Sequence, residues 1–224
     1  MSVDGVTYKL PEAKNPRATK RPWYFVVIGD LFSIVVFSAI VFAAVNLPAF
    51  LSIIKYKLNP DSVAITTYRS EDSAKIEKYP APAEYPENSI VIAKIGVNAP
   101  IIWDVSDEQS VEKLQQGVIQ VNGSGKPNEN KNVFVSGHSS NYWWKKGDYN
   151  TVFALLPQLN AKDEIFVTYQ GLTYKYEVKD KIEVEKQAAI KYVSSGKRRL
   201  TLMTCVPVGT NLKRLIVTAV PVGG

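Results

Sequence analysis

The chain has 224 residues and a formal net charge of +6, with 46% apolar and 21% charged residues. These fractions are close to those of folded proteins, so they exclude a wholly disordered or fibrous chain. The basic residues are spread among acidic ones along most of the chain, which argues against a nucleic-acid-binding surface. The length allows a membrane segment and one folded domain, and a second large domain is not expected.

A long apolar run near the N-terminus predicts a transmembrane anchor at residues 23–54. After Asp30 this run carries no charge, and it exceeds the roughly 20 apolar residues that span a bilayer. Asn46 and Pro48 are expected to bend the helix towards its far end. A cleavable signal peptide is the alternative, but the apolar core of such a peptide is usually only about 7–15 residues long.

The residues flanking the run predict its orientation. Residues 1–22 form a basic tail, whereas only Lys55 and Lys57 follow the run closely. Since positive charge favours the cytoplasmic side, the N-terminus is expected inside and the rest of the chain outside the cell. Residues 55–88 are expected to form an extracytoplasmic stalk, because three prolines between residues 79 and 89 favour an extended, semi-rigid spacer.

Residues 89–222 predict one mainly β domain. Short runs rich in Val, Ile, Thr and Tyr are separated by Gly, Pro, Asn and Asp, which is typical of a closed barrel or a sandwich. Short helical insertions are expected at residues 108–116 and 150–159, and a hairpin turn at Gln170-Gly171. The clearest strand-like runs are residues 89–97, 132–137, 164–170, 172–179, 198–204 and 212–220.

One cysteine, Cys205, and one histidine, His138, are present in the sequence. A single cysteine cannot close an intramolecular disulfide, and the two residues are too few for a structural zinc site unless carboxylates complete it. We therefore predict no metal and no cofactor. A lone cysteine is most often a small buried apolar residue, so this interpretation of Cys205 competes with a catalytic one.

Three residues of the β domain could form a site for acyl transfer. His138 follows one strand-like run, Cys205 ends another, and Arg214 lies within the next. An imidazole and a permanent positive charge favour a reactive thiolate, and they can then protonate a departing amine and stabilise an oxyanion. The alternatives are that His138 is a structural loop residue and that Arg214 pairs with a surface carboxylate.

The local sequences around these residues resemble those of sortases. The run Thr201-Leu202-Met203-Thr204-Cys205 resembles the family's TLxTC signature, and residues 133–138 (VFVSGH) resemble the strand that delivers the catalytic histidine. Residues 92–101 and 149–167 also resemble family segments, so the similarity covers most of residues 88–221. The resemblance implies an eight-stranded sortase-type β-barrel with short helices. It also implies that Cys205 is the nucleophile, His138 the general acid/base, and Arg214 the stabiliser of substrate and oxyanion.

The resemblance further implies a membrane-anchored cysteine transpeptidase. Such an enzyme cleaves an LPXTG-like sorting signal through a cysteine thioester, and it transfers the acyl group to an amine of a cell-wall precursor or of another surface protein. The expected partners are surface proteins with a C-terminal sorting signal, the amine acceptor and the membrane, but not nucleic acid.

Two further alternatives stay open: a hydrolytic thiol peptidase on the same fold, and an inactive membrane-tethered binding module. Residues 206–215 are similar to those of pilin-polymerising members. The absence of an Asp-Pro-aromatic lid motif and of a second apolar run instead favours a housekeeping-type or other single-anchor sortase.

Overall fold

The computed structural model describes residues 23–63, 79–80, 85–142, 144–193 and 197–222. The chain divides into two compact units with the boundary after Ile40. The predicted basic tail and most of the predicted stalk, residues 64–78 and 81–84, lie outside the described residues.

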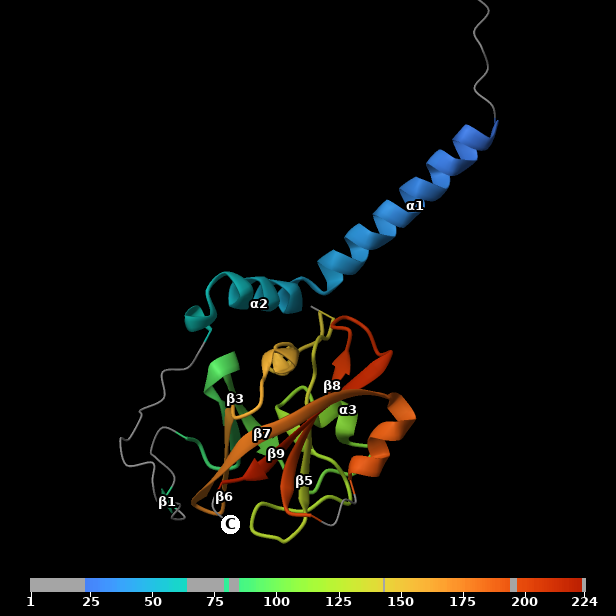
Figure 1. Cartoon of the computed structure of the whole chain (residues 1–224). Helices are drawn as coiled ribbons and strands as arrows, with labels where there is room; N and C mark the ends of the chain where they lie inside the picture. Colours follow the sequence, from blue (N-terminus) through green and yellow to red (C-terminus); the bar gives the residue numbers. More distant parts are fainter. Residues whose placement is uncertain (1–22, 64–78, 81–84, 143, 194–196, 223–224) are drawn as a thin grey trace, which may run out of the picture. The chain divides into compact units, whose positions relative to one another are not determined.

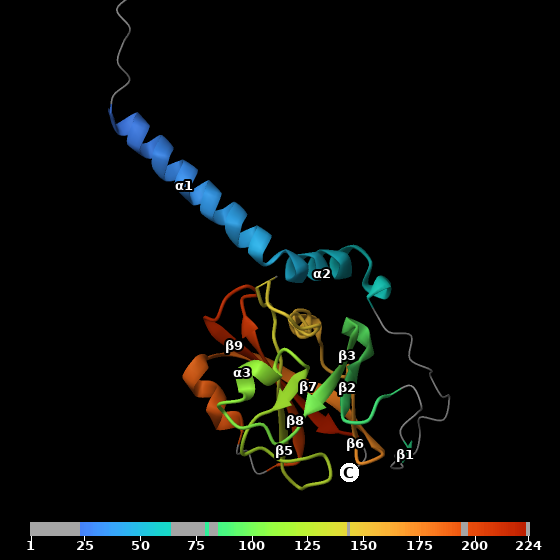
Figure 2. The same ribbon diagram turned by 180° about the vertical axis from the view of Figure 1, so that it is seen from behind.

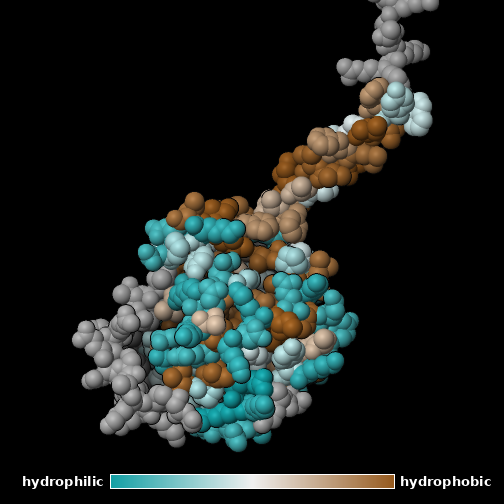
Figure 3. Space-filling model, viewed as in Figure 1, coloured by the Kyte–Doolittle hydropathy of each residue, from teal (hydrophilic) through white to brown (hydrophobic). Residues whose placement is uncertain are grey.

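Helix α1 (Trp23–Val45) begins in the first unit, and its visible surface is mostly apolar (Figure 3). Its 23 residues span about 35 Å at 1.5 Å per residue, which exceeds the roughly 30 Å hydrocarbon core of a bilayer. The helix is therefore long enough and apolar enough to cross a membrane.

The apolar run of residues 23–54 is divided into two helices. Asn46 separates α1 from α2 (Leu47–Leu58), and Pro48 lies in the first turn of α2. Proline suits this position because the first turn of a helix has no backbone acceptor for its N–H groups. The expected bend is thus a break between helices, and α2 belongs to the same unit as the β domain.

Eight strands, β2 to β9, form a closed barrel (Figures 1 and 2). Their order is β7-β6-β2-β3-β4-β5-β8-β9, and β9 pairs again with β7. Among the strands that the structure describes, only the β3–β4 and β5–β8 pairs are parallel. The eight-stranded barrel implied by the family resemblance is confirmed. The strands are β2 (Ser89–Ile92), β3 (Val97–Ile102), β4 (Val118–Gln120), β5 (Asn132–Ser136), β6 (Glu164–Tyr169), β7 (Leu172–Glu185), β8 (Arg199–Val206) and β9 (Lys213–Pro221).

Strand β7 closes the barrel because it is long enough to pair with two neighbouring strands, β6 and β9. Its first part pairs with β6 and its later part with β9, with a register shift between Val178 and Asp180. Such irregularities bend a strand and allow a sheet to curl onto itself. The two-residue strand β1 (Tyr79–Pro80) pairs with the start of β7. The short helices are η1 (Pro60–Ser62), η2 (Ala93–Ile95), α3 (Ser110–Lys113), η3 (Leu156–Gln158) and η4 (Lys186–Tyr192).

The structure refines several sequence expectations. The predicted strand at residues 89–97 is interrupted by η2 and by Gly96, whose φ of 66° turns the chain back into β3. The two predicted helical insertions contain only α3 and η3, each less than two turns long. The predicted hairpin is confirmed, since Gln170 and Gly171 have φ values of 52° and 70°, as a type I′ turn requires. Strand β4 was not predicted because three residues are too few to show an alternating pattern.

Alternate residues of the strands fill the barrel and cover its outer face. Val133, Val135 and Leu202 belong to the inner core. Phe134 instead lies in a second cluster with Ile216 and residues of η4, on the outer face of β5, β8 and β9. These three strands are therefore apolar on both faces, and η4 covers part of the outer one.

Candidate active site

Cys205 and Arg214 lie on the same outer face of the barrel. In the antiparallel pairing of β8 with β9, these two residues are directly opposed. Their neighbours Val206 and Leu215 point into the core, so Cys205 and Arg214 point outwards. Directly opposed residues have Cα atoms about 4.5–5.5 Å apart and side chains on one face. The register alone therefore places Cys205 next to Arg214 on adjacent strands.

His138 reaches the same level from the other side of β8. Strand β5 runs parallel to β8 with Ser136 opposite Met203, and the Gly137 N–H donates to the Met203 carbonyl at 3.1 Å. His138 is two residues beyond Ser136, as Cys205 is two beyond Met203. The backbone thus carries the three predicted residues to the same level, His138 directly after β5, Cys205 on β8 and Arg214 on β9, with Cys205 in the middle.

The two threonines of the TLMTC run hold this arrangement, Thr204 from the inner face of β8 and Thr201 from the outer face beneath η4. Thr204 is buried, and its Oγ1 donates to the carbonyl of Gly137, the residue before His138, at 2.9 Å. Thr201 Oγ1 donates to Asn132 Oδ1 at 2.9 Å, and the Asn132 amide donates to the carbonyl of Tyr192 in η4. The motif therefore ties β8 both to the histidine segment and to the helix that covers the outer face.

Gly137 is required by close packing beside His138. A Cβ atom at this position would lie 2.6 Å from the ring of Phe153, well below ordinary van der Waals contact. The backbone N–H of Phe153 donates to the His138 carbonyl at 2.8 Å. The glycine thus lets Phe153 pack closely enough to fix the backbone of the histidine.

A second set of contacts links the loops that follow His138 and Cys205. The Gly209 N–H donates to Ser140 Oγ at 3.0 Å, and the Cys205 thiol donates to Asn211 Oδ1 at 3.7 Å. Nothing in the sequence marks Ser140 or Asn211 for this role, because serine and asparagine in loops are too common to carry a signal. Only the folding of the two loops against each other reveals their partners.

Burial lowers the pKa of His138 from its ordinary value of 6.5. Its Nε2 atom is buried and has no hydrogen-bond partner among the residues that the structure describes. A low-dielectric environment disfavours the charged imidazolium, so the resting ring is neutral at neutral pH. A neutral imidazole can accept a proton from a thiol, as general base catalysis requires.

We expect His138 to titrate below pH 6.5 in the folded protein, where its ring resonances can be followed by NMR. Assignment is direct because this is the only histidine in the sequence. Since the unfolded state binds this proton at higher pH, the contribution of His138 to stability is present above the ordinary pKa and is lost as the pH falls. The free energy of unfolding of the parent, relative to His138→Gln, should therefore decrease on acidification. A folded-state pKa above 6.5 would contradict this prediction.

We expect Thr204→Val to destabilise the barrel by about 1–3 kcal/mol, because it leaves the buried Gly137 carbonyl without its donor. Urea unfolding monitored by circular dichroism measures the loss. Thr218→Val is the matched control, since the Thr218 hydroxyl makes only an exposed 3.4 Å contact with the Asp180 carbonyl. Equal losses in the two variants would show that the Thr204 bond does not hold the histidine segment.

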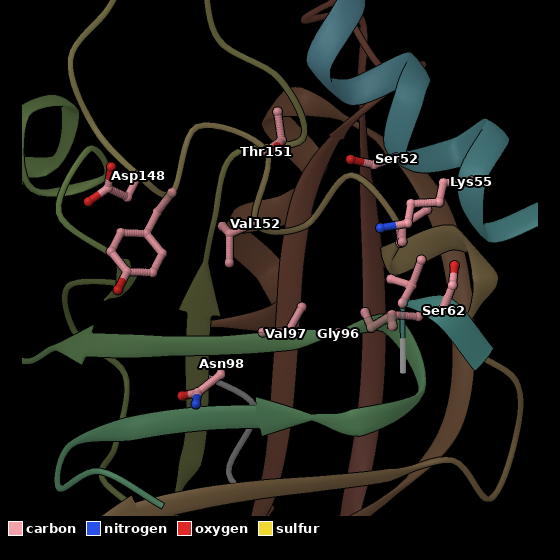
Figure 4. Close-up of a pocket in the computed structure, with 13 residues that line it drawn as sticks. Ser52, Lys55, Ser62, Gly96, Val97, Asn98, Asp148, Thr151 and Val152 are labelled. Carbon is pink, nitrogen blue, oxygen red and sulfur yellow. The ribbon is translucent and has the colours of Figure 1, made fainter. Parts of the chain in front are cut away.

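A cavity of about 390 Å³ lies between α2 and the barrel, apart from the three predicted residues (Figure 4). Ser52 and Lys55 of α2 lie across it from Asn98 of β3 and from the loop residues Asp148, Thr151 and Val152. No group of three or more His, Cys, Asp and Glu side chains that could hold a metal ion occurs in the described part of the chain.

Comparison with known families identifies this architecture. Residues 90–222, which run from β2 to beyond β9, match the family model of the sortase domain. The chain belongs to the sortase family. The matched region contains His138, Cys205 and Arg214, and membership in this family supports a cysteine transpeptidase in general.

Several solved sortases share the fold. Sortase C-1 from Actinomyces oris is 30% identical with a TM-score of 0.52, over 61% of this chain and 73% of that one. Sortase A from Corynebacterium diphtheriae is 28% identical with a TM-score of 0.51, over 63% of each chain. Sortase C1 from Streptococcus suis, at 21% identity and a TM-score of 0.52, shows the fold alone.

These similarities to sortases named A and C are nearly equal, so they assign no subclass. This sortase spans less than two thirds of the Corynebacterium diphtheriae chain. No curated protein matches it significantly.

Proposed function

We propose that this sortase is a membrane-anchored transpeptidase in which Cys205 is the nucleophile, His138 the general acid and base, and Arg214 the oxyanion stabiliser. Its substrate is an LPXTG-like sorting signal of a surface protein. The observation that carries the proposal is the register of three adjacent strands, which places Cys205 opposite Arg214 and level with His138. These are the residue types that acyl transfer through a thioester requires.

The first half-reaction forms the thioester. The neutral His138 ring accepts the thiol proton, and the Cys205 sulfur attacks the carbonyl carbon of the substrate threonine. Negative charge develops on the carbonyl oxygen, where the permanent charge of Arg214 stabilises it. The C–N bond then breaks, and the imidazolium donates its proton to the departing amine.

The second half-reaction transfers the acyl group. An amine of a cell-wall precursor or of another surface protein attacks the thioester carbonyl and gives its proton to His138. The C–S bond breaks, and the imidazolium returns its proton to the Cys205 sulfur, which restores the thiol and the neutral ring. One amide bond has been exchanged for another, so the sequence of steps needs no cofactor. Water in place of the amine gives hydrolysis.

The outer-face cluster supplies a surface for the apolar part of the sorting signal. Met203 and Val184 are only partly buried, and they lie on the same face as Cys205 and Arg214. Val193, just after η4, packs against the same cluster. An extended peptide whose scissile carbonyl reaches Cys205 can therefore place its preceding apolar side chains between η4 and the strands.

The proposed topology is a single pass with the N-terminus in the cytoplasm and the barrel outside the cell. It rests on the length and composition of α1 and on the basic tail that precedes it in the sequence, because positive charge favours the cytoplasmic side.

Incubation of the full-length protein in detergent with an LPXTG-containing peptide tests the activity, with and without a primary-amine acceptor. We expect cleavage after threonine in both reactions, and an amide product containing the acceptor in the second. Cleavage with no transfer to any acceptor would favour a hydrolytic thiol peptidase. Neither cleavage nor an acyl adduct would favour a membrane-tethered binding module.

A further inference from the structure

Helix α2 presents an apolar stripe on its side away from the barrel. Exposed fractions of its apolar side chains are 50% for Leu47, 53% for Leu51, 51% for Ile54 and 82% for Leu58. At about 100° per residue, these four positions fall within an arc of roughly 60°. Figure 3 shows apolar surface along this edge of α2. The stripe is continuous over the length of the helix.

The opposite side of α2 already has a partner. Ala49 is fully buried, and Ile53 and Tyr56 pack against the barrel core. The helix is therefore apolar on two sides, and the residues that the structure describes cover only one of them. In a water-exposed helix the second side would be polar, since amphipathic helices place charge opposite their buried face.

Two loops bring further apolar and basic residues to the barrel end that α2 covers (Figures 1 and 2). In the β8–β9 loop, Leu212 is 68% exposed, and a Cβ on Gly209 would lie 2.8 Å from the Asn46 side chain. In the loop after β5, the exposed rings of Tyr142 and Trp144 stack with their centroids 4.7 Å apart.

Lysines accompany these residues on all three segments. Lys145 and Lys146 directly follow Trp144, Lys213 follows Leu212, and Lys57 lies near the end of α2; all four are exposed. Aromatic and aliphatic side chains interspersed with lysine are the composition that proteins present to the headgroup region of anionic membranes.

We propose that this end of the barrel is a lipid-contacting face, with the α2 stripe buried in the headgroup region of the bilayer. The occupant is lipid because α2 follows α1, the candidate membrane span, with only Asn46 between them. A stripe that begins one residue after a membrane span meets the interface before any other partner. The lysines complement the negative charge of anionic headgroups. This inference rests on the membrane anchor of the proposed function.

With α2 in the interface, the active site would be held at a fixed distance from the membrane surface. The β8–β9 loop, which contacts Asn46 through Gly209, begins directly after the strand that carries Cys205. A barrel held at the membrane by α2 would thus work close to the lipid surface, rather than at the end of the extended, semi-rigid stalk that the prolines predict.

Single fluorescent labels on the full-length protein test this face. Cys205→Ala removes the only thiol, and Leu51→Cys or Leu58→Cys then places an environment-sensitive dye on the stripe. Asn130→Cys is the control at the far end of the barrel, where the chain enters β5, and Phe37→Cys reports on α1. Each protein is reconstituted into vesicles of phosphatidylcholine and phosphatidylglycerol with nitroxide-labelled lipid.

We expect lipid quenching at residues 51 and 58 to exceed that at residue 130 by about three-fold or more, because buried interfacial helices lie some 5–10 Å into the bilayer boundary. Quenching by iodide, which stays in the aqueous phase, should be weaker at residues 51 and 58 than at residue 130. Equal lipid quenching at residues 51 and 130 would overturn the proposal. So would energy transfer between differently labelled Leu51→Cys copies without lipid quenching, since it would make the stripe a dimer contact. An unquenched label at residue 37 would instead refute the anchor of the proposed function.

Discussion

Cys205→Ala is expected to abolish both cleavage and transfer, with a loss of at least about 10⁴-fold in kcat/KM, as removal of a covalent nucleophile does in comparable enzymes. The parent should form an acyl adduct that raises its mass by that of the N-terminal substrate fragment less one water. Mass spectrometry of the intact protein after mixing with substrate detects this thioester, and peptide mapping locates it. The alanine variant should carry no such mass.

The loss of activity in Cys205→Ala can be distinguished from unfolding, because Cys205 is only partly buried and faces outwards. We expect the thermal midpoint of Cys205→Ala to stay within a few degrees of the parent, as for substitutions that create no buried cavity. Turnover by the alanine variant at the parental rate would show that the proposed mechanism is wrong. An adduct on any other residue would do the same.

Arg214→Lys is expected to lower kcat by about 10²-fold, the typical effect of losing one donor to an oxyanion. Arg214 Nη1 donates to the carbonyl of Lys213 at 3.1 Å. The other guanidinium N–H groups extend from the same planar fork, so this contact can fix the direction in which they point. An ammonium keeps the charge but lacks the planar geometry, so it cannot hold its own backbone and the oxyanion together.

A matched substitution at another arginine tests whether the loss of kcat is specific to the position of Arg214. Arg199→Lys makes the same change at the start of β8, six residues before Cys205 and opposite Asn132. We expect that variant to retain the parental kcat within about two-fold, because surface substitutions away from special features have small effects. Comparable kinetic losses in both variants, or near-parental rates for Arg214→Lys, would remove Arg214 from the proposed catalytic group.

The sequence supported the β domain and its candidate residues for local reasons. Alternating β-branched residues marked the main strands, and the two residues Gln170-Gly171 between neighbouring strand-like runs marked a tight hairpin. The TLMTC run carried the family resemblance within five neighbouring residues. Composition alone left Cys205 as an ordinary buried thiol, and its place beside Arg214 comes from the strand register.

The roles of Thr201 and Thr204 illustrate what local sequence cannot reveal. Each donates to a residue 67 or 69 positions away, and such long-range partners exist only after β5 and β8 have paired. The same holds for Ser140 and Gly209, which are also 69 residues apart. Hydrogen bonds of this kind depend on which strands are neighbours, and the order of strands in a sheet does not produce a periodic pattern of residues in the sequence.

The sequence by itself determined an apolar run long enough to cross a membrane, a mainly β domain after it, and the identities of the three candidate residues. Tertiary structure alone decided that the run is two helices and that the second one packs on the barrel. The reason is that hydropathy records only how apolar a segment is, whereas the fold determines whether protein or another apolar medium covers each face.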